Sequence, residues 1–174
     1  MAMGNKLGRF IKHRLWDERD ARRALPADAL TRLAERIAAS ENKHSGQIRI
    51  CVEASLPLRY LRLGASARER ALALFGKLGV WDTEHNNGVL IYLLLAEHAI
   101  EVVADRGLRA QDAAWPPMVE GLRTALQAGR FEDGLNGAVD AAGELLQRAF
   151  PRDADLPGNL PGKGNELPNE VVVL

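Results

Sequence analysis

The amino-acid sequence predicts an α/β protein with helices on both faces of a mixed parallel and antiparallel sheet. Helical and strand-like periodicities alternate along the chain, which is the order found in α/β folds. The segment from Val89 to Leu95 is apolar at every position, as in a strand that is covered on both faces. The pair Glu97-His98 then predicts a hairpin that returns the chain antiparallel.

Length and composition fit one globular domain with short extensions. The chain has 174 residues, of which 47% are apolar and 26% charged, so disorder of the whole chain is disfavoured. Lys plus Arg and Asp plus Glu both number 23, whereas a protein that binds many phosphates carries a basic excess, so bulk nucleic-acid binding is disfavoured. Cys51 is the only cysteine, which excludes an internal disulfide and a multi-cysteine zinc site.

Residues 1–25 form a basic segment ahead of the predicted domain. Four apolar residues share one face of a helix in it, with Trp16 beside them and cations on the remaining positions: Leu7, Phe10, Ile11 and Leu15. Three partners for the apolar face fit this pattern, namely the protein's own domain, a membrane surface contacted through residues 6–16, or another protein.

The sequence shows neither a membrane span nor a secretory signal. The longest apolar run, Val89 to Ala96, is far shorter than the roughly 18 residues that a span needs. The basic N-terminus lacks a continuous apolar stretch and a cleavage site. We therefore expect a cytoplasmic protein, which is peripheral on the inner face of the membrane if residues 6–16 bind there.

The first half of the domain, expected over residues 26–150, reads as helix, strand, helix. A helix is predicted over 26–42, since apolar residues recur at helical spacing after a proline suited to the first turn. Residues 47–55 alternate with the period of a strand. Ser66 to Glu69 is a capping box that starts a helix over 66–78, whose expected buried side consists of Leu72, Phe75 and Leu78.

The second half reads as two strands and two helices, followed by a tail. The strands are expected over 88–96 and 100–104, and the helices over 112–128 and 131–150. The tail, residues 151–174, is rich in Pro and Gly and cannot form its own core. Its last four residues are apolar, so they must pair with a sheet edge or lie on a partner.

This topology brings distant polar residues to one edge of the sheet. The helix between the first two strands makes them parallel, and the hairpin makes the third antiparallel to the second. The starts of the first two strands and the end of the third then share one edge. The polar and charged residues expected near it are Asp82, Glu84, His85, Asn86, Asn87, Asp105 and Arg106.

Two interpretations of this edge stay open. Carboxylate and amide oxygens are hard ligands, which suit Ca²⁺ or Mg²⁺. Alternatively, Asn86-Asn87-Gly88 only forms a turn, which these residues favour because Asn and Gly tolerate positive φ. The sequence contains no GxSxG, HExxH or CxxC motif, and Gly158 to Gly164 reads as a linker rather than a phosphate loop.

Two motifs, NNGVLI at 86–91 and DRGL at 105–108, carry a resemblance to the TPM-domain family. That family is named for a thylakoid lumen protein, a photosystem II repair protein and a nematode acetylcholine-receptor modulator. The resemblance covers about residues 26–150, and an Asn-Glu-Leu-Pro tail at 165–168 is similar to that of small bacterial members. It implies an α/β/α sandwich around a mixed sheet, in agreement with the periodicities.

The resemblance also implies a site and partners. The site would hold a divalent cation, Ca²⁺ or Mg²⁺, on the residues Asp82, Asn86, Asn87 and Asp105. Some relatives have a weak acid-phosphatase activity. Small bacterial members are often encoded beside a LemA-type membrane protein and a secreted TPM relative, which are the protein partners that the resemblance suggests.

Two classes of function follow. The first is a non-catalytic accessory or interaction module at the cytoplasmic membrane face, with a structural cation. The second is a metal-assisted phosphomonoesterase, in which Arg106 would hold the phosphate and Glu84 or His85 would move a proton. The first is favoured, because only two or three acids converge and they lie on a turn. The sequence gives neither the substrate nor the oligomeric state.

Overall fold

A four-stranded sheet forms the centre of the protein. The computed structural model describes residues 2–152 and 165–174, with side chains from Leu7 onward. The strands, in the spatial order β3-β2-β1-β4, are β3 (Ala99–Ala104), β2 (Gly88–Leu94), β1 (Gln47–Glu53) and β4 (Val172–Val173). Strand β1 pairs in parallel with β2 and β4, and β3 runs antiparallel to β2, so the predicted mixed sheet is confirmed.

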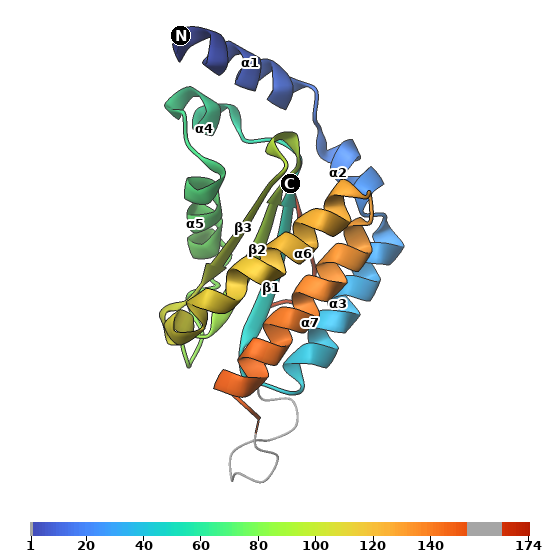
Figure 1. Ribbon diagram of the computed structural model, residues 1–174, viewed down its shortest axis with the longest axis vertical. Helices are drawn as coiled ribbons and strands as arrows, with labels where there is room; N and C mark the ends of the chain where they lie inside the picture. The colour runs from blue at the N-terminus through green and yellow to red at the C-terminus, as the bar shows by residue number, and fades with distance from the viewer. Residues whose placement is uncertain (1, 153–164) are drawn as a thin grey trace.

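Helices cover both faces of this sheet (Figure 1). One face carries α3 (Ala27–Glu41), α6 (Trp115–Gln127) and α7 (Phe131–Ala149), and the other carries α4 (Leu58–Leu63) and α5 (Ala67–Lys77). The α/β/α sandwich is therefore confirmed. Within the described ranges, no helix combines the length and the apolar character needed to cross a membrane.

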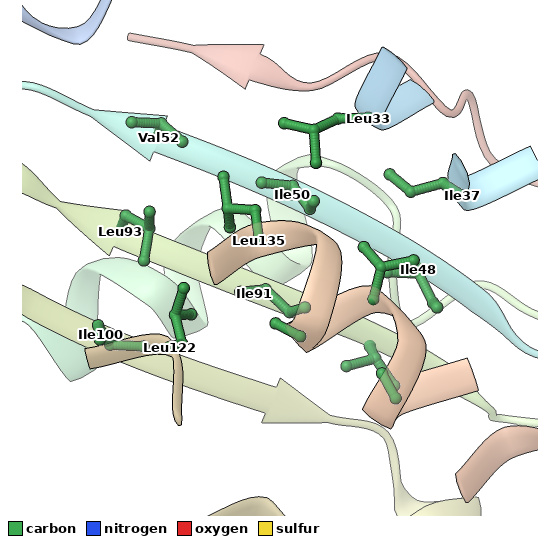
Figure 2. Packing of buried hydrophobic residues seen from close by; sticks show 14 of the residues in the cluster. Leu33, Ile37, Ile48, Ile50, Val52, Ile91, Leu93, Ile100, Leu122 and Leu135 are labelled. Atoms are coloured by element: carbon green, nitrogen blue, oxygen red, sulfur yellow. The ribbon is translucent and has the colours of Figure 1, made fainter. Parts of the chain in front are cut away.

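Side chains alternate along the strands between two hydrophobic cores. The core under α3, α6 and α7 takes alternate residues of two strands, namely Ile48, Ile50, Val52, Val89, Ile91 and Leu93. Figure 2 shows Leu33 and Ile37 of α3 and Leu135 of α7 lying against them. The core under α5 takes the opposite positions, which are Cys51, Leu90, Tyr92 and Leu94. Every residue of β2 is buried, as its unbroken apolar sequence predicts.

Two helices differ in detail from the expectation. The buried side of α5 consists of Ala67, Arg70, Ala71 and Leu74. Leu72 is 49% exposed, so its predicted burial is wrong, because Arg70 turns inward to pair with Glu53 and thereby sets the rotation of the helix. The helix predicted from residue 112 starts at Trp115, after a 3-10 segment, η2 (Arg106–Ala114), since its two prolines fit only a first turn.

The N-terminal segment forms two helices, α1 (Ala2–Arg14) and α2 (Glu18–Ala24). Helix α1 contacts the body of the protein through its polar side, where Arg9 and His13 meet Glu97 of η1 (Leu95–Glu97). Leu7 and Ile11 of α1 and Leu15, directly after the helix, are exposed, whereas Phe10 is 37% exposed and lines a hollow that Leu58 of α4 also lines. Trp16 instead lies edge-on against the ring of His98, with ring centroids 6.2 Å apart.

The C-terminal residues complete the protein's own sheet, so of the two alternatives for the apolar end, pairing with a sheet edge is confirmed. Leu174 donates its N–H to Val52 and accepts from the N–H of Ala54, at 2.9 and 2.8 Å. The side-chain oxygen of Gln47 accepts the N–H groups of Glu166 and Leu167, both at 3.0 Å. Residues 153–164, which contain the predicted Gly158 to Gly164 linker, lie outside the described residues.

Candidate functional site

The amino ends of β1 and β2 and the carboxyl end of β3 form one edge of the sheet, as the topology predicts. Gln47 pairs with Gly88, and Val89 pairs with Ala104. The loop before β2, residues 78–87, therefore lies beside the loop after β3, residues 105–107. We refer to these two loops as the polar edge.

Two glycines allow the loops of the polar edge to approach closely. A Cβ atom on Gly88 would lie 2.0 Å from the carbonyl oxygen of Val80, and one on Gly107 would lie 2.5 Å from that of Asn86. Asn86 itself has φ +52°, a left-handed conformation that asparagine tolerates well. The motifs NNG and DRG thus contain their glycines because another backbone fills the space of a side chain.

Hydrogen bonds hold the two loops together. The N–H of Gly107 donates to the carbonyl oxygen of Asn86, and the N–H of Asp105 donates to that of Gly88, both at 2.9 Å. The Nε of Arg106 donates to Oδ1 of Asn86, also at 2.9 Å. The structure therefore brings Asn86 and Asn87 together with Asp105 and Arg106, although they are about twenty residues apart in the chain.

Two side-chain oxygens of the polar edge are buried without a hydrogen-bond partner in the described part of the chain. They are Oδ1 of Asn87 and Oδ2 of Asp105. The remaining polar atoms of these side chains are used: Nδ2 of Asn87 donates to Ser45 Oγ at 3.2 Å, and Oδ1 of Asp105 accepts the N–H of Arg106 at 2.6 Å. Leaving a buried acceptor unpaired costs about 1–3 kcal/mol, so both oxygens fit the role of cation ligands.

The other residues predicted for the site are exposed or already have a hydrogen-bond partner. Asp82, Glu84 and His85 are exposed on the loop before β2. The side-chain oxygen of Asn86 is already held by Arg106. Among the described residues, no three His, Cys, Asp or Glu side chains are grouped so that they could hold a metal. A cation here would depend on amide and backbone oxygens in addition to carboxylates.

The C-terminal tail also contributes to the polar edge, which the sequence pattern does not predict. Oε2 of Glu166 accepts the N–H of Glu84 at 2.9 Å, and Gln47, which anchors the tail, donates its own N–H to the carbonyl oxygen of Asn87 at 3.4 Å. Thr83 is not predicted either, although its Oγ1 accepts the N–H of Asn87 at 3.0 Å. Hydrophobic periodicity does not indicate such contacts. The Asn-Glu-Leu-Pro motif is the only sequence signal for them.

Two buried titratable groups lie behind the same edge of β1. Burial raises the pKa of Glu41 to about 7, although its Oε1 accepts the N–H of Ile48 at 2.8 Å. Burial likewise lowers the pKa of His44 to about 4. Nδ1 of His44 lies 3.0 Å from the carbonyl oxygen of Gly46, which positions the turn into β1. Burial therefore shifts the protonation equilibrium of both residues toward the neutral form.

A second polar network lies at the opposite end of β1. Arg70 donates twice to the carboxylate of Glu53, at 2.9 and 2.6 Å, and the hydroxyl of Tyr92 donates to the same carboxylate at 2.6 Å. The guanidinium also lies over the ring of Tyr60, 4.7 Å from its centroid. Burial raises the pKa of the neighbouring Cys51 thiol to about 12, so Cys51 is a poor nucleophile and a structural residue.

Comparison with known proteins agrees with this arrangement. The model of the TPM domain matches residues 19–145. The solution NMR structure of the BA42 protein from the psychrophilic bacterium Bizionia argentinensis is similar, with a TM-score of 0.70 and 25% sequence identity over 85% of this chain and 94% of that one. No curated protein matches the chain. Because the TPM model covers most of the described fold, including both motifs of the polar edge, the protein belongs to the TPM-domain family.

Proposed function

We propose that this protein is a non-catalytic TPM-domain interaction module that binds a divalent cation at the polar edge and acts at the cytoplasmic membrane face. The cation proposal depends on one observation, the two buried and unpaired oxygens of Asn87 and Asp105. A divalent cation within reach of both oxygens would satisfy them and would join the loop before β2 to the loop after β3.

The chemistry of the donors favours Ca²⁺ over Mg²⁺. Calcium accepts six to eight oxygen ligands in flexible geometry, whereas magnesium demands a near-ideal octahedron and keeps several waters. Asp82 and Asn86 are the further proposed ligands, and Asn86 would have to release Arg106 to serve as one. The residues that contact the membrane in this proposal are 6–16, in which Leu7, Ile11 and Leu15 are exposed.

The alternative is a weak metal-assisted phosphomonoesterase. It would use Arg106 to hold the phosphate and Glu84 or His85 to transfer a proton. Glu84 and His85 are exposed, and the side chain of Arg106 is already paired with Asn86, so none of the three is held ready in a buried site. A non-catalytic role therefore agrees better with the geometry.

The first experiment is a titration with Ca²⁺ and with Mg²⁺, followed by backbone-amide NMR. We expect saturable shifts confined to residues 82–88 and 104–107, tighter for Ca²⁺ than for Mg²⁺. Asp105→Asn should weaken binding by at least about tenfold, since it removes the buried charge but keeps an oxygen that caps η2. Asp112→Asn, an exposed acid of η2 outside the edge, is the matched control and should bind as the wild type does.

Two outcomes would contradict the proposal. Absence of saturable shifts at millimolar Ca²⁺ would mean that the polar edge is only turn structure. Hydrolysis of p-nitrophenyl phosphate that requires the cation and is abolished by Arg106→Gln, in a protein that remains folded, would favour the phosphomonoesterase over the non-catalytic module.

A further inference from the structure

Helix α1 is attached to the body of the protein by its polar side. Nε of Arg9 donates to Oε1 of Glu97 at 2.6 Å, and a second nitrogen of the guanidinium donates to the carbonyl oxygen of Ala65 at 2.6 Å. His13 is 3% exposed and lies between Leu56 and Glu97. Because Leu56 donates its N–H to Nδ1 of His13 at 3.0 Å, the proton of the neutral ring is on Nε2, which donates to Glu97 at 2.8 Å.

This attachment determines which side of α1 faces outward. Leu7 and Ile11 of α1 are 63% and 52% exposed, and Leu15, directly after the helix, is 76% exposed. A helix on a folded domain normally buries such a stripe, because each leucine side chain transferred from water is worth about 2 kcal/mol. Here the stripe cannot turn inward unless Arg9 and His13 leave Glu97. The fold therefore holds the apolar side of α1 toward its surroundings.

Helix α4 presents a second surface of the same kind. Leu58 and Leu63 are 44% and 76% exposed, and Arg59 and Arg62 between them are exposed too. Figure 1 shows α1 and α4 at the same end of the molecule. The two helices flank one open hollow of about 750 Å³, which Phe10 lines from α1 and Leu58 lines from α4. Neither helix contains an acidic residue, although acids and bases balance over the whole chain.

We propose that α1 and α4 together form a single surface that binds anionic phospholipid bilayers. The exposed leucines would enter the interface, and Lys12, Arg14, Arg59 and Arg62 would meet the headgroup phosphates. The membrane affinity of interfacial helices increases with the buried apolar area and with the attraction to anionic lipids, and α4 adds to both. This inference rests on the proposed action at the membrane face and adds α4 to the residues 6–16 named there.

The test is co-sedimentation of the full chain with vesicles of phosphatidylglycerol and phosphatidylcholine, compared with vesicles of phosphatidylcholine alone. We expect wild type to prefer the anionic vesicles. Leu58→Gln with Leu63→Gln should lower the partition coefficient by at least about tenfold. Leu72→Gln, which changes an exposed leucine on α5, is the matched control and should leave binding unchanged.

The charge contribution is tested separately. Arg59→Gln with Arg62→Gln should remove about tenfold or more of the preference for anionic vesicles. Lys77→Gln with Arg109→Gln alters the net charge equally at exposed positions outside α1 and α4, and it should retain most of that preference. All substituted side chains are exposed, and amide spectra would verify that each variant is folded.

Two outcomes separate the inference from the proposed function. If the α4 variants bind like wild type while Leu7→Gln with Ile11→Gln loses binding, α1 alone contacts the membrane and the inference is overturned. If wild type binds neither vesicle, both the inference and the proposed action at the membrane face fail, and these helices then present a surface for a protein. Cation binding is measured without vesicles, so its result stands apart from either outcome.

Discussion

Two residues near the start of β1, Glu41 at the end of α3 and His44 in the following turn, have shifted pKa values with opposite consequences for stability. Glu41 has a folded-state pKa of about 7, above its ordinary 4.5, so the folded protein binds this proton more tightly than the unfolded chain. His44 has a folded-state pKa of about 4, below its ordinary 6.5, so folding expels its proton. The stabilisation from Glu41 is complete below pH 4.5 and is lost as the pH rises to 7. The contribution of His44 is lost as the pH falls from 6.5 to 4.

Glu41→Gln tests the first of these effects. The substitution keeps an oxygen for the N–H of Ile48 but removes the titration. Relative to wild type, the free energy of unfolding of the variant should increase between pH 4.5 and 7, by roughly 3 kcal/mol at most. Urea denaturation at pH 5 and pH 8 measures it, with Glu35→Gln on the exposed side of α3 as the control. Equal differences from wild type at both pH values would show that Glu41 is ionised throughout.

Among the secondary-structure elements, α1 is the one whose position depends on a few polar contacts. Burial alone would raise the pKa of Glu97, but hydrogen bonds from His13 and Arg9 outweigh it and hold the pKa below its ordinary value. The carboxylate is therefore ionised when α1 is docked. Protonation of Glu97 in acid would weaken the same contacts, and stability from this source is lost as the pH falls below the ordinary pKa of the group.

Glu97→Gln should loosen α1 without unfolding the sheet. Arg9 and His13 would lose a charged acceptor, and we expect amide exchange in residues 10–14 to accelerate roughly tenfold or more. Exchange in β1 and β2 should remain slow. Glu101→Gln on β3, whose partner Arg68 lies 3.6 Å away, is the control and should leave α1 protected. Unchanged exchange in α1 of the Glu97 variant would show that other contacts hold the helix.

In the molecule as a whole, the sequence predicts the layers but not how the two ends of the chain attach to them. The unbroken apolar run of β2 indicates burial on both faces, and the Ser66 capping box marks the start of α5, because these signals are local. Arg9 and Glu97 are 88 residues apart, and Gln47 and Glu166 are 119 apart. Such contacts follow from the completed fold, so no periodicity reveals them.

For the polar edge too, the sequence predicts which residues come together but not how each side chain is placed. Strand topology alone placed Asn86 and Asn87 near Asp105 and Arg106, since the register of neighbouring strands follows from their order. It could not distinguish Asn87, which is buried, from Asp82, which is exposed, because both lie in one polar loop. The orientation of each side chain depends on close contacts such as that of Gly88 with Val80.

Gln47→Met tests whether the side chain of Gln47 holds the C-terminal tail on the domain. The side chain keeps its approximate volume but leaves the N–H groups of Glu166 and Leu167 without their acceptor. We expect the free energy of unfolding to fall by about 2 kcal/mol, with faster amide exchange at residues 166–174. Gln147→Met on the exposed side of α7 is the control. A tail that remains protected in the Gln47 variant would show that β4 pairing suffices to hold it.

The pairing of β1 with β4 also has a consequence for synthesis. Cys51 pairs with Val172, so 121 residues separate the two partners. At about 5–20 residues per second, a ribosome needs roughly 6–24 s to make the second partner after the first. Throughout that time one edge of β1 has no neighbouring strand, and an open edge is a template for strands of other chains. During translation, therefore, this edge of β1 is open to pairing that β4 prevents in the finished fold.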